Sequence, residues 1–541
     1  ASAVLSHLLW RPAKPATPTY SRLTFRRGNI GTARFAPDGR SVVYGASWEG
    51  QPIEIYTTRP EGPESTPIGM KNADLFSVSP TGELAISLRE RFLAGPSGVG
   101  TLATVPIGGG APRPIAEFVG RADWTPDGKQ LAVVRFLEGR NRLELPLGKI
   151  LYGSERWLDV LRISPDGNWV ALLERARSGR SLLIVDRAGK SRTLAGPRIR
   201  GQGIAWSRSG DEIWFDDRGE RGQFVLNAVD FSGRVRTLAS APVGLILHDI
   251  SGDGRVLVER YGSQPGILGL APGETRERDL SWFDGSSPAG LSNDGRILLI
   301  NESGDAAGRG GTYYLRKTDG SPAVRLGEGT ALDLSADGKW ALAHAADSPE
   351  SMVLQPTGTG TPISIGRAGF EGARRGWIFP DGKRLLIAAN EPGRKRRFYV
   401  QDIPSGKPRA ISTEGPDSTG HPISPDGRWV VGFRDWAEDL FLFPTEGGEQ
   451  RTIPDTKALD PICWSPDGKF LIATETGTIP ARVVRIDIAT GSREHWKDLA
   501  PPELGGVIGV GPVWMTPDGR SYVYGYARAA TSDLYLVEGL K

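Results

Sequence analysis

The chain has 541 residues, including 72 glycines and 41 prolines, and its 66 basic and 63 acidic residues give a formal net charge of +3. This small and mixed charge excludes a basic stripe for nucleic acid, and the single cysteine excludes a disulfide framework and a cysteine-based zinc site. Glycine is about twice as frequent as the average of roughly 7%, and no long window has a helical period, so we expect an almost entirely β chain.

The first 19 residues have a composition of their own. An apolar stretch, "ASAVLSHLLW", precedes the proline-rich "RPAKPATPT". The apolar stretch is too short to cross a bilayer, which needs about twenty residues, and proline-rich segments act as semi-rigid spacers. We interpret residues 1–19 as the membrane-proximal remnant of an anchor followed by a linker, with a leader peptide as the alternative. The interpretation implies a membrane tether on the N-terminal side.

A hairpin pattern recurs along the rest of the chain. In "CWSPDGKFLIAT", Pro466 fixes φ for a turn, Asp467 can accept a backbone hydrogen bond two residues on, and Gly468 takes the positive φ. The apolar residues on either side then form two antiparallel strands. The same pattern occurs twelve times, marked by Gly39, Gly82, Gly128, Gly167, Gly210, Gly254, Gly295, Gly338, Gly382, Gly427, Gly468 and Gly519.

The spacing of these glycines predicts a repeat architecture. Successive glycines are 39 to 51 residues apart, close to the period of four-stranded propeller blades. A third apolar strand, such as "LLIVD", and a fourth, such as "SRTLA", follow each hairpin. The last copy ends after its third strand, "LYLVEG", and "YSRLTF" at residues 20–25 supplies the missing fourth strand, which leaves no unpaired edge.

Twelve blades exceed the four to eight of a typical ring. The fold class we predict is therefore all-β, with twelve four-stranded blades in two tandem six-bladed β-propellers, residues 20–273 and 274–541. "RERDLSW" at residues 276–282 would open the second ring as "YSRLTF" opens the first. Five plus seven blades is the alternative. Six plus six requires Arg34 and Asp249 to be neighbours, because they lie on the first and sixth inner strands.

Inner strands also carry the polar residues that could reach a ligand. Loops converge on a rigid scaffold at the mouth of a propeller channel, which is where ligands bind. For each residue the competing interpretation is structural, because charges on packed inner strands must be paired. The candidate ligand-binding residues are Arg34, Asp123, Arg162, His248 and Asp249 in the first ring, and Asp333, Arg375 and His421 in the second.

No catalytic constellation is apparent in the sequence. The five histidines lack HExxH spacing, no GxSxG nucleophile motif occurs, and "GVGTLA" opens a strand rather than the helix of a dinucleotide site. The Asp-Gly turns lack the ligand density of a calcium loop. Cys463 lies on an inner strand, where a small apolar role is expected. We expect no enzyme activity, no catalytic residues, no metal and no cofactor.

Several stretches carry a resemblance to a known family. They include "YSRLTFRRGNIGTARFAPDGRSVVYGASWEG", "GRNRLELPLGKILY", "ILGLAPGETRERDLSWFDGSS" and "MTPDGRSYVYGYARAATSDLYLVEGLK". The repeated hairpin resembles WD40-like repeats of TolB-like propellers. The longer stretches resemble the region C-terminal to the kinase domain in acidobacterial, eukaryotic-like Ser/Thr protein kinases. In that family a kinase, a membrane helix and a propeller ectodomain follow one another, and the kinase and the helix are missing from this chain.

The resemblance implies a non-catalytic extracytoplasmic sensor or binding module, periplasmic or on the cell surface. Its partner would be an unknown small molecule, peptide or envelope protein, and not a nucleic acid. One alternative is a protein-interaction or self-assembly scaffold with possible self-association. Another is the propeller partner of a serine peptidase whose hydrolase would be a separate chain.

Overall fold

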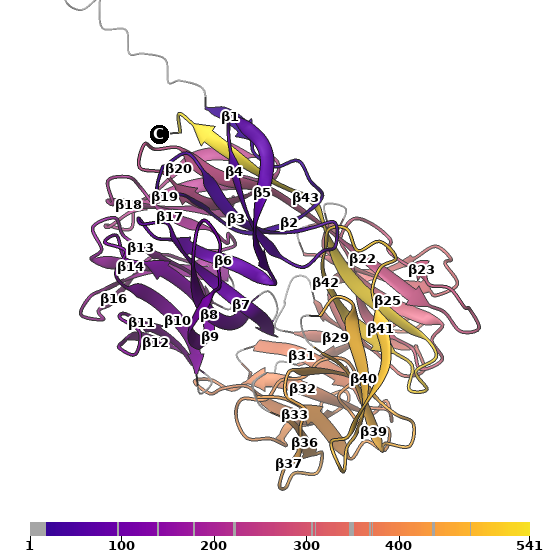
Figure 1. The fold of residues 1–541 in the computed structure, drawn as a ribbon. Coiled ribbons are helices and arrows are strands. Elements are labelled where there is room, and N and C mark those ends of the chain that lie inside the picture. Colours follow the sequence, from indigo (N-terminus) through magenta and orange to yellow (C-terminus); the bar gives the residue numbers. More distant parts are fainter. Residues whose placement is uncertain are drawn as a thin grey trace, which may run out of the picture. The chain divides into compact units, whose positions relative to one another are not determined.

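The computed structural model describes residues 18–540 except 95–96, 138–139, 177–178, 220–222, 305–306, 309, 346–350, 367–368, 371, 435–438 and 476–477. The membrane-proximal stretch inferred for residues 1–19 lies almost wholly outside the described residues. The described residues form strands and turns (Figure 1). The expected all-β class is confirmed.

The repeated turn has the chemistry that its sequence predicts. All twelve marker glycines have φ between 64° and 90°. In the copy at residue 465, the amide of Lys469 donates to Oδ1 of Asp467 over 3.1 Å, and the amide of Phe470 donates to the hydroxyl of Ser465 over 3.0 Å. These bonds close the turn within six consecutive residues, from Ser465 to Phe470.

The chain divides into two compact units. Unit 1 consists of residues up to Glu90, Ser97–Gly262 and Ala530–Lys541, and unit 2 consists chiefly of Ser263–Ala529. The predicted division fell at residues 273 and 274, between two consecutive segments. The observed grouping differs because the chain leaves unit 1 after Gly262 and returns to it at Ala530, so unit 2 is inserted within unit 1.

Unit 1 is built from antiparallel sheets of four strands, two of which share β9. The strands, in chain order, are β1 (Thr19–Arg22), β2 (Gly28–Phe35), β3 (Val42–Trp48), β4 (Glu54–Arg59), β5 (Gly62–Lys71), β6 (Ala73–Val78), β7 (Glu83–Ala94), β8 (Ser97–Pro106), β9 (Arg113–Trp124), β10 (Leu131–Leu137), β11 (Arg140–Glu144), β12 (Ile150–Ser154), β13 (Leu158–Ile163), β14 (Trp169–Ala176), β15 (Gly179–Asp186), β16 (Ser191–Ile199), β17 (Ile204–Trp206), β18 (Glu212–Arg218), β19 (Phe224–Asp230), β20 (Val235–Ala241), β21 (Gly244–Ile250) and the first half of β22 (Val256–Leu270).

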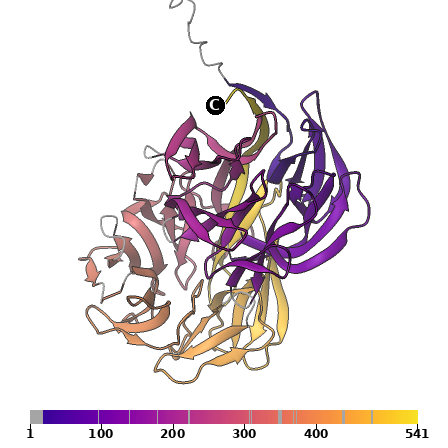
Figure 2. The same cartoon turned by 90° about the vertical axis from the view of Figure 1, so that its left-hand side faces the viewer.

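The inner strands of unit 1 contact one another in a closed order, β2, β6, β9, β13, β17, β21 and back to β2. The sheet that completes this circle has the order β21, β22, β43 and β1. Its third strand is the end of β43 (Tyr522–Glu538), and its fourth strand, β1, pairs with β43 from Thr19 opposite Glu538 to Arg22 opposite Tyr535. Both views show β1 beside the C-terminal end of β43 (Figure 1, Figure 2). The expected pairing of the two termini is therefore present.

Unit 2 follows the same plan. Its remaining strands are β23 (Arg278–Asp279), β24 (Ser286–Leu291), β25 (Ile297–Glu302), β26 (Thr312–Lys317), β27 (Val324–Leu334), β28 (Trp340–Ala345), β29 (Met352–Pro356), β30 (Ile363–Ile365), β31 (Gly372–Ile378), β32 (Arg384–Asn390), β33 (Arg397–Asp402), β34 (Arg409–Ala410), β35 (Trp429–Gly432), β36 (Leu440–Pro444), β37 (Arg451–Ile453), β38 (Leu459–Trp464), β39 (Phe470–Glu475), β40 (Ala481–Asp487), β41 (Arg493–Leu499) and β42 (Val507–Met515). The stretches "SYVYGY" and "LYLVEG" lie on the single strand β43. They are not the two strands of one blade that the sequence predicts.

Buried apolar side chains fill the space between neighbouring sheets. One such cluster joins Leu173 and Ile184 of one sheet to Trp206 and Phe215 of the next. Each fully buried side chain of this size contributes about 1.5–3 kcal/mol. Because both faces of a sheet are packed in this way, a polar side chain on an inner strand must find a partner close by or face the axis of the unit.

Candidate functional site

The charged residues of unit 1 meet across its axis. Nη2 of Arg162 on β13 donates to Oδ1 of Asp249 on β21, and Nε of Arg162 lies 3.9 Å from Oδ2 of Asp123 on β9. Strand β17 lies between β13 and β21 in the circle, so the pair of Arg162 and Asp249 spans the interior. Burial disfavours the Arg162 cation, but Asp249 and Asp123 outweigh it and raise its pKa.

Both carboxylates also hold an adjacent inner strand. Oδ2 of Asp123 accepts the amide of Ile163 over 2.9 Å, and Oδ2 of Asp249 accepts the amide of Phe35 over 3.0 Å. Asp123 therefore joins β9 to β13, and Asp249 joins β21 to β2. Burial raises the pKa of Asp123, and Arg162 partly offsets this effect.

Arg34 lies beside the same group. Its Nη1 donates to the carbonyl oxygens of Ala33, over 2.8 Å, and His248, over 2.7 Å. Burial, together with repulsion from Arg162, lowers the pKa of Arg34 to about 9. Arg34 and Asp249 are thus neighbours, as the prediction of six blades in the first ring requires.

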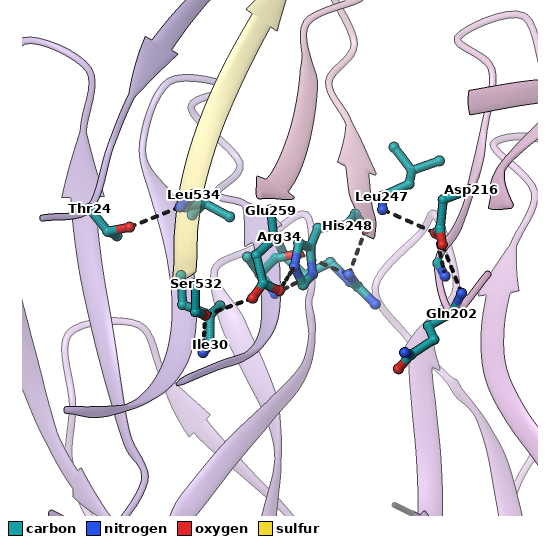
Figure 3. A network of polar contacts seen from close by, with 12 residues as sticks. Thr24, Ile30, Arg34, Gln202, Asp216, Leu247, His248, Glu259, Ser532 and Leu534 are labelled. Atoms are coloured by element: carbon teal, nitrogen blue, oxygen red, sulfur yellow. Dashed lines mark hydrogen bonds and ion pairs between the residues drawn. The ribbon is translucent and has the colours of Figure 1, made fainter. Parts of the chain in front are cut away.

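His248 belongs to a buried chain of hydrogen bonds (Figure 3). Nδ1 of His248 accepts the amide of Ala33 over 3.3 Å, so its proton is on Nε2, which donates to Oε2 of Glu259 over 3.1 Å. Oε1 of Glu259 accepts the Ser532 hydroxyl over 2.6 Å, and the Ser532 oxygen accepts the amide of Ile30 over 2.8 Å. Each polar group named in this series of hydrogen bonds has a partner, which indicates a structural role for His248.

Another buried carboxylate of unit 1, Asp216, was not among the sequence candidates. Asp216 accepts the amides of Gln202 over 2.9 Å, Gly203 over 2.7 Å and Leu247 over 3.2 Å (Figure 3). Burial raises the pKa of Asp216 to about 6. It lies on β18, the second strand of its sheet, so a pattern of polar residues on inner strands does not include it.

In unit 2, the buried Asp333 lies beside the half-buried His421. Oδ2 of Asp333 accepts the amide of Ile378 over 2.8 Å, and its Oδ1 lies 3.6 Å from Nδ1 of His421. Burial raises the pKa of Asp333 to about 8 and lowers that of His421 to about 4. Burial therefore favours the neutral form of both groups. The Trp514 ring packs edge-on against His421 at 4.7 Å.

The inner segment that carries His421 is irregular. Residues 412–423 form no continuous strand and make two isolated bridges, Asp417 with Phe433 and Ile423 with Val430, whereas β31 and β38 are continuous strands. Gly420, with φ of 53°, permits this course, because a Cβ there would lie 2.3 Å from the carbonyl oxygen of Ile462. The sequence "STEGPDSTGHP" lacks the apolar alternation of the other inner strands, a signal that could have located this segment.

Arg375 on β31 faces this segment. Its Nη1 donates to the carbonyl oxygen of Ser418, and its Nε lies 3.9 Å from Oδ1 of Asp417. The other oxygen of Asp417 is paired with Arg396 through Nη1. The Arg375 side chain is 43% exposed, whereas that of Arg162 in unit 1 is 14% exposed.

Asp460 on β38 completes the group of polar side chains. Its Oδ1 accepts the hydroxyl of Thr419, which also donates to the carbonyl oxygen of Pro461 over 3.0 Å. Burial raises the pKa of Asp460 to about 6, and Thr419 and Arg375 counteract the shift. We call Arg375, Arg396, Asp417, Thr419 and Asp460 the unit 2 cluster. Only Arg375 among them was a sequence candidate.

Among the described residues, no three metal-ligating side chains are grouped, and no helix is long and apolar enough to span a membrane. Cys463 is buried, and burial raises the pKa of its thiol to about 12. This thiol is a small apolar side chain of the core, as expected for its strand.

The sheets define the protein as an all-β protein of the propeller type. No known protein family and no curated protein matches the chain. Among solved structures, a chain assigned as TolB from Agrobacterium tumefaciens has 21% identity and a TM-score of 0.35 over 50% of this chain and 99% of that one.

Two further solved structures cover more of this chain. TolB from Acinetobacter baumannii has 14% identity and a TM-score of 0.22 over 68% of this chain and 65% of its own. The GH74 enzyme of Niastella koreensis has 11% identity and a TM-score of 0.34 over 92% of this chain and 90% of its own. At these identities and TM-scores no ligand, partner or activity follows for this chain.

Proposed function

We propose that the chain is a non-catalytic binding module made of two six-bladed propellers, which acts outside the cytoplasm and recognises its ligand at the unit 2 cluster. The observation that carries the proposal is the contrast between the two units. In unit 1 the inner charges bind one another, and Arg162 is largely shielded. In unit 2 one inner segment is irregular, and the side chain of Arg375, which faces it, is 43% exposed.

This contrast matters because departures from local regularity in a repeat fold concentrate at functional sites. Arg375, Asp417, Thr419 and Asp460 come from three successive inner segments, and Arg396 precedes β33, the third strand of the sheet that carries Arg375. Side chains converging from several segments of a rigid scaffold are how such a fold positions a binding site. A role as the ectodomain of a membrane-anchored bacterial Ser/Thr kinase fits the family resemblance and the composition of the first 19 residues. A scaffold that assembles envelope proteins is the alternative.

Native mass spectrometry after incubation with an envelope extract of the source organism tests this function. We expect a discrete small-molecule or peptide adduct on the wild type that is absent from Arg375→Gln. The matched control is Arg325→Gln, because Arg325 is an exposed arginine of unit 2 paired with Glu328 on the same strand. An adduct that persists in Arg375→Gln moves the site elsewhere. Higher-order complexes without a small adduct favour the scaffold.

A further inference from the structure

We infer that Arg375 and Asp460 together bind the carboxylate and the ammonium group of a zwitterionic amino acid. The inference rests on the proposed function and names the ligand class of the same cluster. Such a ligand requires a cation and an anion that are close together, that are not joined to each other by an ion pair, and that can each still bind a group of opposite charge.

Arg375 is the open cation. Within the described residues its guanidinium has one hydrogen bond, to the carbonyl oxygen of Ser418, and a long contact of 3.9 Å to Asp417. Asp417 is itself engaged by Arg396, whose side chain is only 17% exposed. Nη2 of Arg375 has no partner among the described residues and can donate to an incoming carboxylate.

Asp460 is the anion, a carboxylate without an ion-pair partner among the described residues. One oxygen accepts the Thr419 hydroxyl, and no ion pair is made by this carboxylate within the described part of unit 2. Burial raises its pKa to about 6, because the attraction of Arg375 does not fully replace the lost hydration. A bound ammonium group would supply the missing countercharge and stabilise the ionised carboxylate.

The two charges are held apart by consecutive residues. Arg375 binds the backbone of Ser418, and Asp460 binds the side chain of Thr419. Arg375 is close enough to Asp460 to lower the pKa of this carboxylate, and no ion pair joins the two side chains among the described residues. A ligand with both charges close together on one molecule satisfies both groups, whereas a simple anion would leave Asp460 unpaired and would be repelled by it.

Saturation-transfer NMR with a mixture of the protein L-amino acids is the first test. The amino acid with the strongest response is then compared with its amide, which lacks the carboxylate, and with its deaminated acid, which lacks the ammonium. We expect both analogues to bind the wild type at least about tenfold more weakly.

Two variants assign each half of the ligand. In Arg375→Gln the amino acid and its amide should bind equally weakly, and in Asp460→Asn the amino acid and its deaminated acid should do so. Arg325→Gln should keep the wild-type preference. Equal binding of all three compounds to the wild type, or an unchanged preference in both variants, would overturn the inference.

A complete absence of response to the mixture would also overturn it. That result leaves the proposed function intact if the extract still gives an adduct that depends on Arg375. Circular dichroism and thermal melting of the variants separate a lost contact from a lost fold.

Discussion

Ser532 donates a 2.6 Å hydrogen bond to Glu259, 273 residues earlier in the chain. The same serine accepts the amide of Ile30, near the beginning of the fold. One buried hydroxyl thus connects the first inner strand, the last sheet of unit 1 and the C-terminal strand. The closure of unit 1 depends on residues that the chain supplies last.

Replacing Ser532 by alanine should weaken unit 1. The change leaves the amide of Ile30 and one oxygen of Glu259 without partners in a buried network, so we expect the free energy of unfolding to fall by about 1–3 kcal/mol. Urea titration measures this effect. Ser232→Ala is the control, because Ser232 lies on an exposed turn and should change stability by less than about 0.5 kcal/mol. Equal effects of the two changes would contradict a structural role for Ser532.

Deleting residues 530–541 should open unit 1 and spare unit 2, because this segment belongs to unit 1 only. Hydrogen exchange should rise in β1, β21 and the first half of β22. The buried thiol of Cys463 in unit 2 should stay protected from a thiol reagent in native buffer. Deletion of residues 540–541 alone is the control. Rapid labelling of Cys463 in the longer deletion would show that unit 2 cannot persist without the C-terminal strand.

Arg162→Met should be strongly destabilising. It leaves Asp123 and Asp249 buried with Arg34 as the one cation that acts on both in the described part of unit 1, and breaking a buried pair costs about 3–5 kcal/mol. Arg236→Met removes an arginine from an exposed pair with Glu212 at 2.7 Å, and it should cost less than about 1 kcal/mol. Chemical denaturation compares the two variants. A loss at Arg162 no larger than that at Arg236 would mean that the ion pair across unit 1 does not stabilise the fold.

Asp333 should make stability fall with rising pH. Its pKa is about 8 in the folded chain against 3.8 in the unfolded chain, so the folded state retains a proton that the unfolded state releases. The contribution of Asp333 to the free energy of unfolding is therefore fully present below about pH 4 and is lost as pH rises toward 8. His421, with its pKa lowered to about 4 from 6.5, acts in the opposite direction below pH 6.5.

Between pH 6.5 and pH 8 the contribution of Asp333 should dominate, at up to about 1.4 kcal/mol per pH unit. Asp333→Asn keeps an acceptor for the amide of Ile378 but cannot ionise, so it should flatten this slope. Urea titrations at several pH values in the window measure the slope. An identical slope in wild type and variant would show that Asp333 is ionised in the folded protein.

The sequence by itself determined the repeat and its turns. A turn such as that at Gly468 depends on contacts between residues no more than five apart, for example Ser465 with Phe470, so its chemistry is visible in any short window. The same holds for the burial of Cys463 on an apolar inner strand. Pairing of the two chain ends was also predictable, because a missing fourth strand and a surplus first strand stood at opposite termini.

Only the tertiary structure decided which groups meet across the sheets. No local signal shows that "LYLVEG" returns to unit 1, because any apolar strand can pair with any open edge. Likewise, Arg34, Arg162 and Asp249 have the same inner-strand position as Asp333, yet the first three share countercharges and Asp333 keeps a proton. Desolvation and countercharge depend on neighbours from distant strands, and these distances, unlike turn chemistry, do not exist until the sheets have packed.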